Sequence, residues 1–199
     1  IKAKYYFIET NNINFDKIIS KIIHDKKING FNVTVPFKKD IVKYVEIKNQ
    51  HAKSIGAINC VAIERKVKGI NTDWVGYLNS IKGIKIKKNN NILVLGYGGA
   101  SQAIVYGLFL KGFSSVVVFN RSKKIIRFSK TKTYTKKYSL IDNYLTNADL
   151  IINTTPTNPL NQKQLQLVQK KTTVSDIVYK PKNTTFLDNF KENKKIYGI

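Results

Sequence analysis

Cysteine and methionine are almost absent from this 199-residue sequence, which contains a single cysteine, Cys60, and no methionine. A lone cysteine excludes an intrachain disulfide and is typical of proteins from a reducing compartment. No apolar run approaches the roughly 20 residues that a membrane-spanning helix needs. Residues 1–20 also lack the apolar stretch and cleavage site of a secretory signal. We therefore expect a cytoplasmic protein without a membrane partner.

Histidine is scarce too, and the two that occur, His24 and His51, have no cysteine or acidic cluster beside them. Zinc sites need three or four such ligands at short spacing. We therefore expect no metal, and we interpret Cys60 as a small buried residue.

Acidic residues are few, with 12 against 35 basic residues and a formal net charge of +23. Such an excess raises nucleic-acid binding as one hypothesis, which predicts a contiguous basic face. However, only 3 of the basic residues are arginine, the side chain that base readers and phosphate clamps favour, and the lysines are spread along the chain. We interpret the lysines as the product of A/T-rich codons and expect no nucleic-acid partner. Their charge also favours an anionic substrate and a phosphorylated cofactor.

The first half of the chain alternates short apolar segments with amphipathic ones. A hairpin-like pair is predicted at 57–64 and 66–71, because both segments are apolar and one residue separates them. Pro36 suits the first position of a helix. The expected strands are 4–9 and 31–35, and the expected helices are 15–25, 36–46 and 72–81.

The second half has a different pattern, with strands that are apolar on both faces. The expected strands are 91–96, 114–120, 148–155 and 172–179, and the expected helices are 98–112, 122–130 and 187–194. Apolar strands that alternate with helices predict a parallel, doubly wound sheet. The polar, lysine-rich segment 81–91 reads as a linker between domains. We therefore predict an α/β protein of two domains, residues 1–82 and 83–199.

A glycine-rich turn joins the strand ILVL to the helix after it. Its pattern, Gly96-x-Gly98-x-x-Ser101, approximates the dinucleotide-binding fingerprint with serine at the third glycine position. Gly96 allows a tight turn, Gly98 lets the backbone approach a pyrophosphate, and the helix N-terminus supplies free N–H groups. A plain tight turn is the alternative, but the strand–turn–helix context favours a Rossmann-type cofactor domain.

The end of the next strand indicates which dinucleotide binds. An NAD site places Asp or Glu there, on the ribose 2′-hydroxyl. Here the strand runs into Asn120-Arg121-Ser122-Lys123-Lys124, which contains no carboxylate. Cationic side chains suit a 2′-phosphate, so the sequence favours NADP, although a solvated helix start has the same composition.

Polar side chains gather where the strands of the first half end. They are Asn32, Thr34 and Lys38 in NVTVPFK, Asn59 in GAIN, and Asn71, Thr72 and Asp73 in GINTD. A hydride-transfer enzyme needs a proton donor beside the carbonyl that it reduces. A Lys–Asp pair can polarise that carbonyl and carry protons. Local turn capping and an exposed lysine are the alternative interpretation.

These segments together give the chain a resemblance to the shikimate dehydrogenase family. NVTVPFK, GAIN, GINTD, a GxGGAS loop, NRS, INTT and DIVYKP follow in this order over nearly the whole sequence. The resemblance implies an N-terminal α/β substrate-binding and catalytic domain and a C-terminal NADP-binding domain. It also implies the NADPH-dependent, reversible reduction of 3-dehydroshikimate to shikimate, a step towards chorismate and the aromatic amino acids.

The same resemblance assigns roles residue by residue. Lys38 and Asp73 match the catalytic pair and also touch substrate, as do Asn32, Thr34, Asn59 and Tyr179. The residues that match the cofactor site are Gly96, Gly98, Gly99, Ala100, Ser101, Asn120, Arg121, Ser122, Lys123, Thr154 and Ile177.

Some features of the family are missing from the sequence. Because it lacks methionine and begins at Ile1, we expect a fragment without the family's N-terminal serine pair and C-terminal glutamine. The alternatives are a quinate-using relative that takes NAD and a relative that has lost activity. The sequence leaves a monomer and a homodimer equally open.

Overall fold

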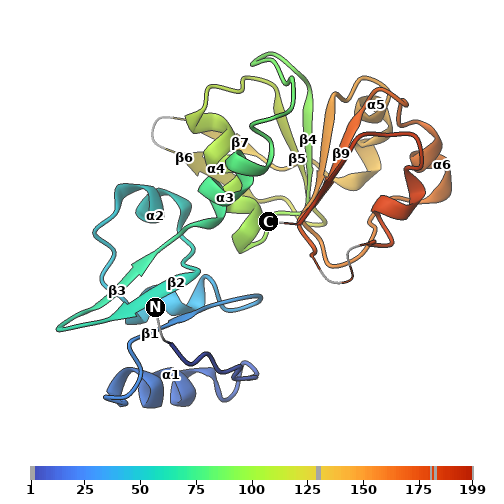
Figure 1. Ribbon diagram of the computed structural model, residues 1–199. Coiled ribbons are helices and arrows are strands. Elements are labelled where there is room, and N and C mark those ends of the chain that lie inside the picture. The colour runs from blue at the N-terminus through green and yellow to red at the C-terminus, as the bar shows by residue number, and fades with distance from the viewer. Residues whose placement is uncertain (1–2, 129–130, 180, 182, 199) are drawn as a thin grey trace.

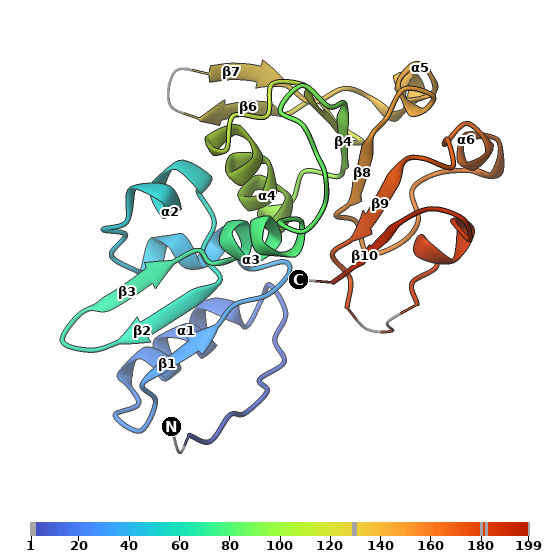
Figure 2. The ribbon, with the colours of Figure 1, turned by 45° about the horizontal axis from the view of Figure 1, so that its top comes forward.

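The computed structural model describes residues 3–128, 131–179, 181 and 183–198. The chain forms two lobes (Figure 1). The front lobe holds a three-stranded sheet with its helices, and the rear lobe holds a five-stranded sheet with its helices. Helices α3 and α4 lie between them, on the side of the rear sheet that faces the front lobe (Figure 2).

The front lobe is built on an antiparallel sheet of order β1-β2-β3. Helix α1 buries Phe15, Ile19 and Ile22 against it, which is the i, i+4, i+7 stripe of an amphipathic helix. The predicted helix at 15–25 and the predicted hairpin are therefore confirmed. The elements are α1 (Phe15–His24), β1 (Gly30–Asn32), the 3-10 helix η1 (Asp40–Tyr44), α2 (Gln50–Ile55), β2 (Cys60–Ile63) and β3 (Val67–Ile70).

Three expectations for the front lobe were wrong. Residues 4–9 form no strand, and Tyr5, Tyr6 and Phe7 are exposed, because a strand needs a neighbouring edge and this segment pairs with none among the described residues. The strand at 31–35 ends earlier, at Asn32.

The segment 36–46 contains a short 3-10 helix instead of an α-helix. The Lys38 carbonyl accepts the Ile58 N–H at 2.7 Å, so it is not the partner of Val42, whose N–H bonds to Lys39 instead. This contact between segments stops an α-helix from forming and fixes the backbone of Lys38.

The rear lobe is a parallel sheet of order β10-β9-β8-β4-β5, which confirms the doubly wound prediction. The chain leaves β4 for β5 on one side and later returns to β8 on the other. The elements are α3 (Asp73–Ser80), β4 (Ile92–Leu95), α4 (Gly99–Leu110), β5 (Val116–Phe119), β6 (Ile125–Phe128), β7 (Thr131–Tyr134), η2 (Tyr138–Leu140), α5 (Asp142–Leu145), β8 (Leu150–Asn153), α6 (Gln162–Gln166), β9 (Thr173–Asp176), η3 (Leu187–Asn189) and β10 (Lys195–Tyr197).

Alternate residues of the central strand serve two separate cores. In β4, Ile92 and Val94 pack with α4, whereas Leu93 and Leu95 pack with the opposite layer of α5 and η3. The strand is therefore apolar throughout, and its carboxyl end lies where the chain reverses direction across the sheet. Ligands of open α/β sheets bind at such a switch point.

Two helices predicted for the rear lobe were also wrong. The segment 122–130 contains the strand β6, which pairs with β7. In β6, Ile126 and Phe128 are buried whereas Ile125 and Arg127 are exposed. This alternation with a period of two is typical of a strand and not of a helix. Residues 129 and 130 of that prediction lie outside the described part. The segment 187–194 forms only the short η3 before β10 begins.

The two lobes meet through helix α4. Gly107 allows α3 to approach closely, since a Cβ there would lie 3.3 Å from Leu78 and 3.4 Å from Trp74. His51 of α2 places its ring 4.8 Å from that of Trp74, and its Nδ1 is 2.6 Å from the Tyr106 hydroxyl. Among the helices of the described residues, none is long and apolar enough to cross a membrane.

Candidate active site

Lys38 and Asp73 form an ion pair at the junction of the lobes. Lys38 Nζ lies 2.7 Å from Asp73 Oδ2, and the two side chains are only 12% and 14% exposed. Lys38 follows β1 and Pro36, while Asp73 is the first residue of α3. The structure thus brings the two predicted catalytic residues, 35 positions apart, into direct contact.

Asn59 holds the other side of the carboxylate. Its amide nitrogen donates to Asp73 Oδ1 at 2.7 Å and to Thr72 Oγ1 at 2.9 Å. Its amide oxygen accepts the Thr72 N–H at 2.9 Å. Both oxygens of Asp73 therefore accept a hydrogen bond, and the orientation of Asn59 is fixed by Thr72.

Asn71 is a positioning residue to which the sequence assigned no separate role. Its side-chain oxygen accepts the Asp73 N–H at 3.0 Å, and its amide nitrogen donates to the Ala57 carbonyl at 2.8 Å. It is buried, and it fixes the start of α3 against the loop that precedes β2. The available signal was the Asn-x-Asp spacing, since Asn commonly bonds the backbone two residues on.

Asn32 joins this cluster, whereas Thr34 does not bond to it. Asn32 donates to the Asn59 carbonyl at 3.1 Å and accepts from the Tyr5 hydroxyl. Both Asn32 and Thr34 are exposed and flank the buried Val33, but the strand ends at Asn32 and Val35 is exposed too, so the shared face of Asn32 and Thr34 stays a prediction. Among the described residues, Thr34 makes no side-chain hydrogen bond with the Lys38–Asp73 pair.

The glycine-rich turn lies at the switch point of the rear sheet. Gly96 follows β4 with φ at +96°, and a Cβ there would lie 2.8 Å from Thr155 Cγ2 and 2.9 Å from Thr154 Oγ1. Thr154 belongs to the end of β8, where its hydroxyl donates to the Leu95 carbonyl at 2.6 Å. Ser101 donates to the Gly96 carbonyl at 2.8 Å and closes the turn.

The outer part of this turn is open and faces Lys38. A Cβ on Gly98 would meet nothing within 4 Å, whereas one on Gly99 would lie 3.0 Å from Lys38 Cβ. Ala100 and Ser101 are buried behind them in the first turn of the 12-residue helix α4. Free N–H groups at that helix start, beside an open glycine backbone, suit a pyrophosphate. The turn therefore places an open glycine backbone and a helix N-terminus next to the Lys–Asp pair.

We expect the two glycines to differ in their effect on stability. Gly96→Ala should lower the free energy of unfolding by about 2–4 kcal/mol, because φ is positive and the new Cβ meets both threonines. Gly98→Ala, the same chemical change in open space, should stay within about 1 kcal/mol of the parent. Urea unfolding of both variants measures this, and equal losses would contradict the geometry described here.

The segment after β5 presents the predicted cationic groups. Asn120 donates to the Ser122 carbonyl at 2.9 Å, which curls the segment back on itself. Arg121 and Lys123 are exposed, and Lys123 Nζ sits 4.6 Å from the centre of the Tyr134 ring. Burial raises the pKa of the neighbouring Tyr138 to about 12, so that residue stays a neutral phenol. The donor set is cationic and suits a phosphate.

A buried polar network holds the ends of β8 and β9. Asp176, only 1% exposed, accepts from Thr184 Oγ1 at 2.7 Å, from Asn153 Nδ2 at 3.2 Å and from the Val178 N–H at 3.0 Å. Asn153 in turn accepts from Thr155 at 2.7 Å. The network thereby fixes the loop that packs against Gly96.

The last two predicted residues follow β9. Ile177 donates its N–H to the Asn153 carbonyl at 3.1 Å, at the end of the strand. Tyr179 is 69% exposed and lies beside Gly198. A Cβ added to Gly198 would be 2.9 Å from the Cβ of Tyr179. Among the described residues, Tyr179 forms no hydrogen bond with the Lys–Asp pair.

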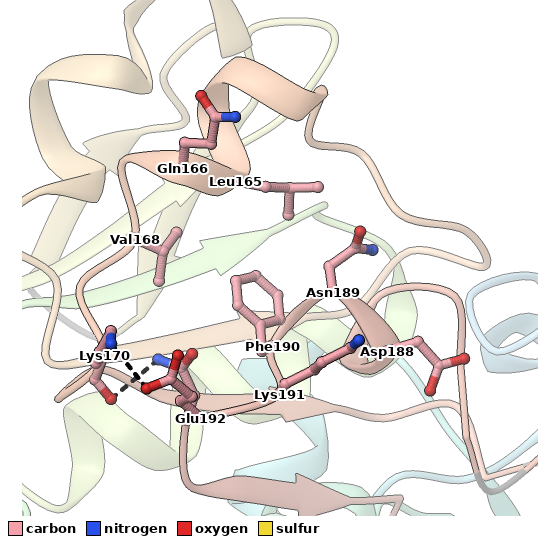
Figure 3. Close-up of a pocket in the computed structure, with 10 residues that line it drawn as sticks. Leu165, Gln166, Val168, Lys170, Asp188, Asn189, Phe190, Lys191 and Glu192 are labelled. Carbon is pink, nitrogen blue, oxygen red and sulfur yellow. Dashed lines mark hydrogen bonds and ion pairs between the residues drawn. The ribbon is translucent and has the colours of Figure 1, made fainter.

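A separate surface hollow lies at the other side of the rear lobe. It measures about 450 Å³ and is lined by residues of the segments 165–170 and 188–193 (Figure 3). The ion pair of Lys170 and Glu192, with 2.8 Å between the charged atoms, lies at one end of it. None of the predicted site residues lines this hollow. Within the described ranges, no group of three or more His, Cys, Asp or Glu could hold a metal ion.

Comparison with known proteins matches two family models to successive parts of the chain. The family model for the shikimate dehydrogenase substrate binding domain matches residues 1–61, and the model for shikimate / quinate 5-dehydrogenase matches residues 80–187. Shikimate dehydrogenase (NADP(+)) of Staphylococcus epidermidis is 39% identical over 183 residues, which cover 88% of this chain and 67% of that protein.

Solved structures agree with these sequence matches. The crystal structure of shikimate dehydrogenase from Aquifex aeolicus is 32% identical, with a TM-score of 0.77 over 94% of this chain and 71% of that one. The Thermus thermophilus enzyme, solved in complex with NADP(H) and shikimate, is 25% identical, with a TM-score of 0.73 over 95% and 73% of the two chains.

Proposed function

Since the chain belongs to the shikimate dehydrogenase family, we propose that it catalyses the reversible, NADP-dependent oxidation of shikimate to 3-dehydroshikimate. It is an oxidoreductase that acts on a CH–OH group. The observation that supports this best is the 2.7 Å Lys38–Asp73 pair, which lies beside the glycine turn. The Staphylococcus epidermidis relative is named for this activity and cofactor, and the Thermus thermophilus enzyme was solved in complex with NADP(H) and shikimate.

The residues divide the chemistry between the lobes. NADPH supplies the hydride that the carbonyl carbon receives. Lys38 is suited to hydrogen-bond the carbonyl oxygen, stabilise the negative charge that develops on it, and give it a proton. Asp73 holds the ammonium through Oδ2, and Asn59 prevents the carboxylate from rotating. The contact between Lys38 and Gly99 places this amine next to the cofactor turn.

The remaining site assignments form part of the proposal. Asn32, Thr34, Asn59 and Tyr179 are proposed to bind the substrate's hydroxyl and carboxylate groups. Gly96, Gly98, Gly99, Ala100 and Ser101 are proposed to cradle the pyrophosphate, with Thr154 and Ile177 near the nicotinamide. Asn120, Arg121, Ser122 and Lys123 are proposed to bind the adenosine 2′-phosphate. The domain boundary near residue 82, a cytoplasmic location and a monomeric or dimeric state stay predictions.

Formation of NADPH from shikimate and NADP, followed by absorbance, tests the proposed reaction. We expect turnover with NADP and much slower turnover with NAD, because the segment from Asn120 to Lys124 offers cations and no carboxylate. A strong preference for NAD would contradict the cofactor assignment, and the absence of turnover with both cofactors would contradict the reaction.

The cradle has its own test. We expect Gly98→Ala to raise KM for NADP by about tenfold or more, since a methyl group would occupy the space through which the pyrophosphate approaches. KM for shikimate and the free energy of unfolding should change little. A variant with the parent's KM for NADP would show that the pyrophosphate does not lie on this turn.

A further inference from the structure

Helix α2 of the front lobe is hydrogen-bonded to helix α4 of the rear lobe at two places (Figure 2). His51 Nδ1 lies 2.6 Å from the Tyr106 hydroxyl. The Ile55 carbonyl accepts from the Gln102 amide nitrogen at 3.3 Å, in the amide orientation that gives both polar atoms of this side chain a partner. The two bonds are four residues apart on each helix, so they lie on one face of α2 and one face of α4. Because position 51 pairs with 106 and 55 with 102, the two helices run antiparallel.

The same register continues beyond the end of α2. Gly56 ends that helix in the left-handed conformation, with φ at +67°, and Ala57 follows it. A Cβ on Gly99, the first residue of α4, would lie 3.6 Å from the Cβ of Ala57. The carboxyl end of α2 therefore meets the glycine turn at the start of α4.

The residues directly after α2 hold the proposed catalytic groups. The Ile58 N–H donates to the Lys38 carbonyl at 2.7 Å. The Asn59 amide donates to Asp73 Oδ1, also at 2.7 Å. A shift of α2 along α4 would therefore move the Lys–Asp pair relative to the glycine turn. The register of these two helices sets the distance between the two halves of the proposed active site.

A tryptophan packs at the same junction. Trp74 follows Asp73 in α3 and is the single tryptophan of the sequence. Its ring centre lies 4.8 Å from that of His51 and 5.9 Å from that of Tyr106, and the latter two rings are 5.8 Å apart. Three rings from three helices thus contact one another. The fluorescence of Trp74 therefore reports on the contact between α2 and α4.

We propose that His51 and Tyr106 are positioning residues whose hydrogen bond locks the register of α2 on α4, and so sets the Lys38–Asp73 pair against the glycine turn for hydride transfer. This inference rests on the proposed function, in which neither residue touches substrate or cofactor. Hydride transfer needs reacting atoms about 3–3.5 Å apart, and a misplacement of about 1 Å can lower the rate by about 10²-fold. A bond remote from the reacting atoms therefore controls kcat.

Removal of one hydroxyl group tests this effect on turnover. We expect Tyr106→Phe to lower kcat for shikimate oxidation by about tenfold, because the ring beside Trp74 remains and only the bond to His51 is lost. Kd for NADP, measured by calorimetry without shikimate, should change less than about twofold, since the proposed cofactor residues all belong to the rear lobe. The parent's kcat in this variant, or a Kd for NADP weakened as much as kcat is lowered, overturns the proposal.

Two further variants supply the controls. Tyr6→Phe removes an exposed hydroxyl of the front lobe and should match the parent in kcat and in Kd. His51→Phe keeps a ring beside Trp74 and removes Nδ1, so it should lose as much kcat as Tyr106→Phe. In the double variant the loss should exceed that of either single variant by less than about twofold, because one bond is removed only once. Losses that multiply would show that the two residues act independently and would overturn the lock.

The emission of Trp74 tests the lock without any turnover. Loss of one hydrogen bond shifts a two-state equilibrium by about fivefold, so the fraction of molecules in which α2 has left α4 should rise in Tyr106→Phe. We expect acrylamide to quench Trp74 at least about twofold more strongly in this variant than in the parent or in Tyr6→Phe. Equal quenching in all three proteins contradicts the proposal. Because neither shikimate nor NADP is present, a parent without turnover would refute the proposed function alone, and Trp74 would still decide whether the lock exists.

Discussion

Lys38→Met is expected to lower kcat for shikimate oxidation by about 10³-fold. Proton transfer and stabilisation of a developing alkoxide each contribute factors of roughly 10²–10⁴. Methionine keeps an unbranched side chain, so the packing of Lys38 against Gly99 is largely preserved while the ammonium is lost. The loss should fall on kcat more than on KM for NADP, since the amine acts on the carbonyl and not on the pyrophosphate.

Two measurements separate this effect from unfolding. Urea unfolding should show a change of at most a few kcal/mol, because Asn59 still bonds the Asp73 carboxylate that the variant leaves without its ion-pair partner. Calorimetry should show that NADP still binds. Turnover within about threefold of the parent would remove Lys38 from the chemistry. Lys53→Gln, on the solvent face of α2, is the control for the loss of one charge.

The contact between Lys38 and Asp73 was predictable because its signals are local. NVTVPFK and GINTD each place polar groups directly after an apolar strand, and strand ends on one sheet edge converge. The strands of the rear sheet were predictable for a related reason. A strand that is buried on both faces, such as Ile92–Leu95, is a continuous apolar run instead of an alternating one.

The errors occur where a distant segment decides the local structure. The helix predicted at 36–46 fails because Ile58 takes the Lys38 carbonyl, and that bond joins residues 20 positions apart. The helix predicted at 122–130 fails because β7 offers an edge to IIRF. Residues 4–9 have strand composition but no edge to join. Propensity indicates which conformation a segment prefers, whereas pairing depends on which edges are available.

The supporting residues of the site were the least visible in the sequence. Asn71 donates to the backbone carbonyl of a residue 14 positions away. Asp176 accepts from a backbone N–H two positions away and from the side chain of Asn153 on the neighbouring strand. An asparagine or aspartate at a strand end looks the same whether it faces solvent or is buried. Only the register of β8 with β9, which sets Asn153 beside Asp176, shows that this carboxylate is part of the cofactor lobe's internal network.

Asp73→Asn is expected to lower kcat by about 10²–10³-fold and the free energy of unfolding by about 1–3 kcal/mol. In the parent, Oδ1 accepts from Asn59 and Oδ2 accepts from Lys38, so both neighbours are donors. An asparagine has one acceptor, and either orientation of its amide points N–H at a donor. Asn59 cannot rotate to help without losing the bond that its oxygen accepts from the Thr72 N–H.

Exchanging the side chains at positions 59 and 73 separates the loss of turnover from the loss of stability. In the double variant Asn59→Asp with Asp73→Asn, the new carboxylate accepts from the amide at position 73, and that amide's oxygen faces Lys38. Net charge and hydrogen-bond complementarity are restored, so most of the lost stability should return. Turnover should stay low, because the carboxylate no longer touches the amine that carries the proton. Recovery of turnover together with stability would show that Asp73 serves only to hold the fold, and the pair would lose its role in proton transfer.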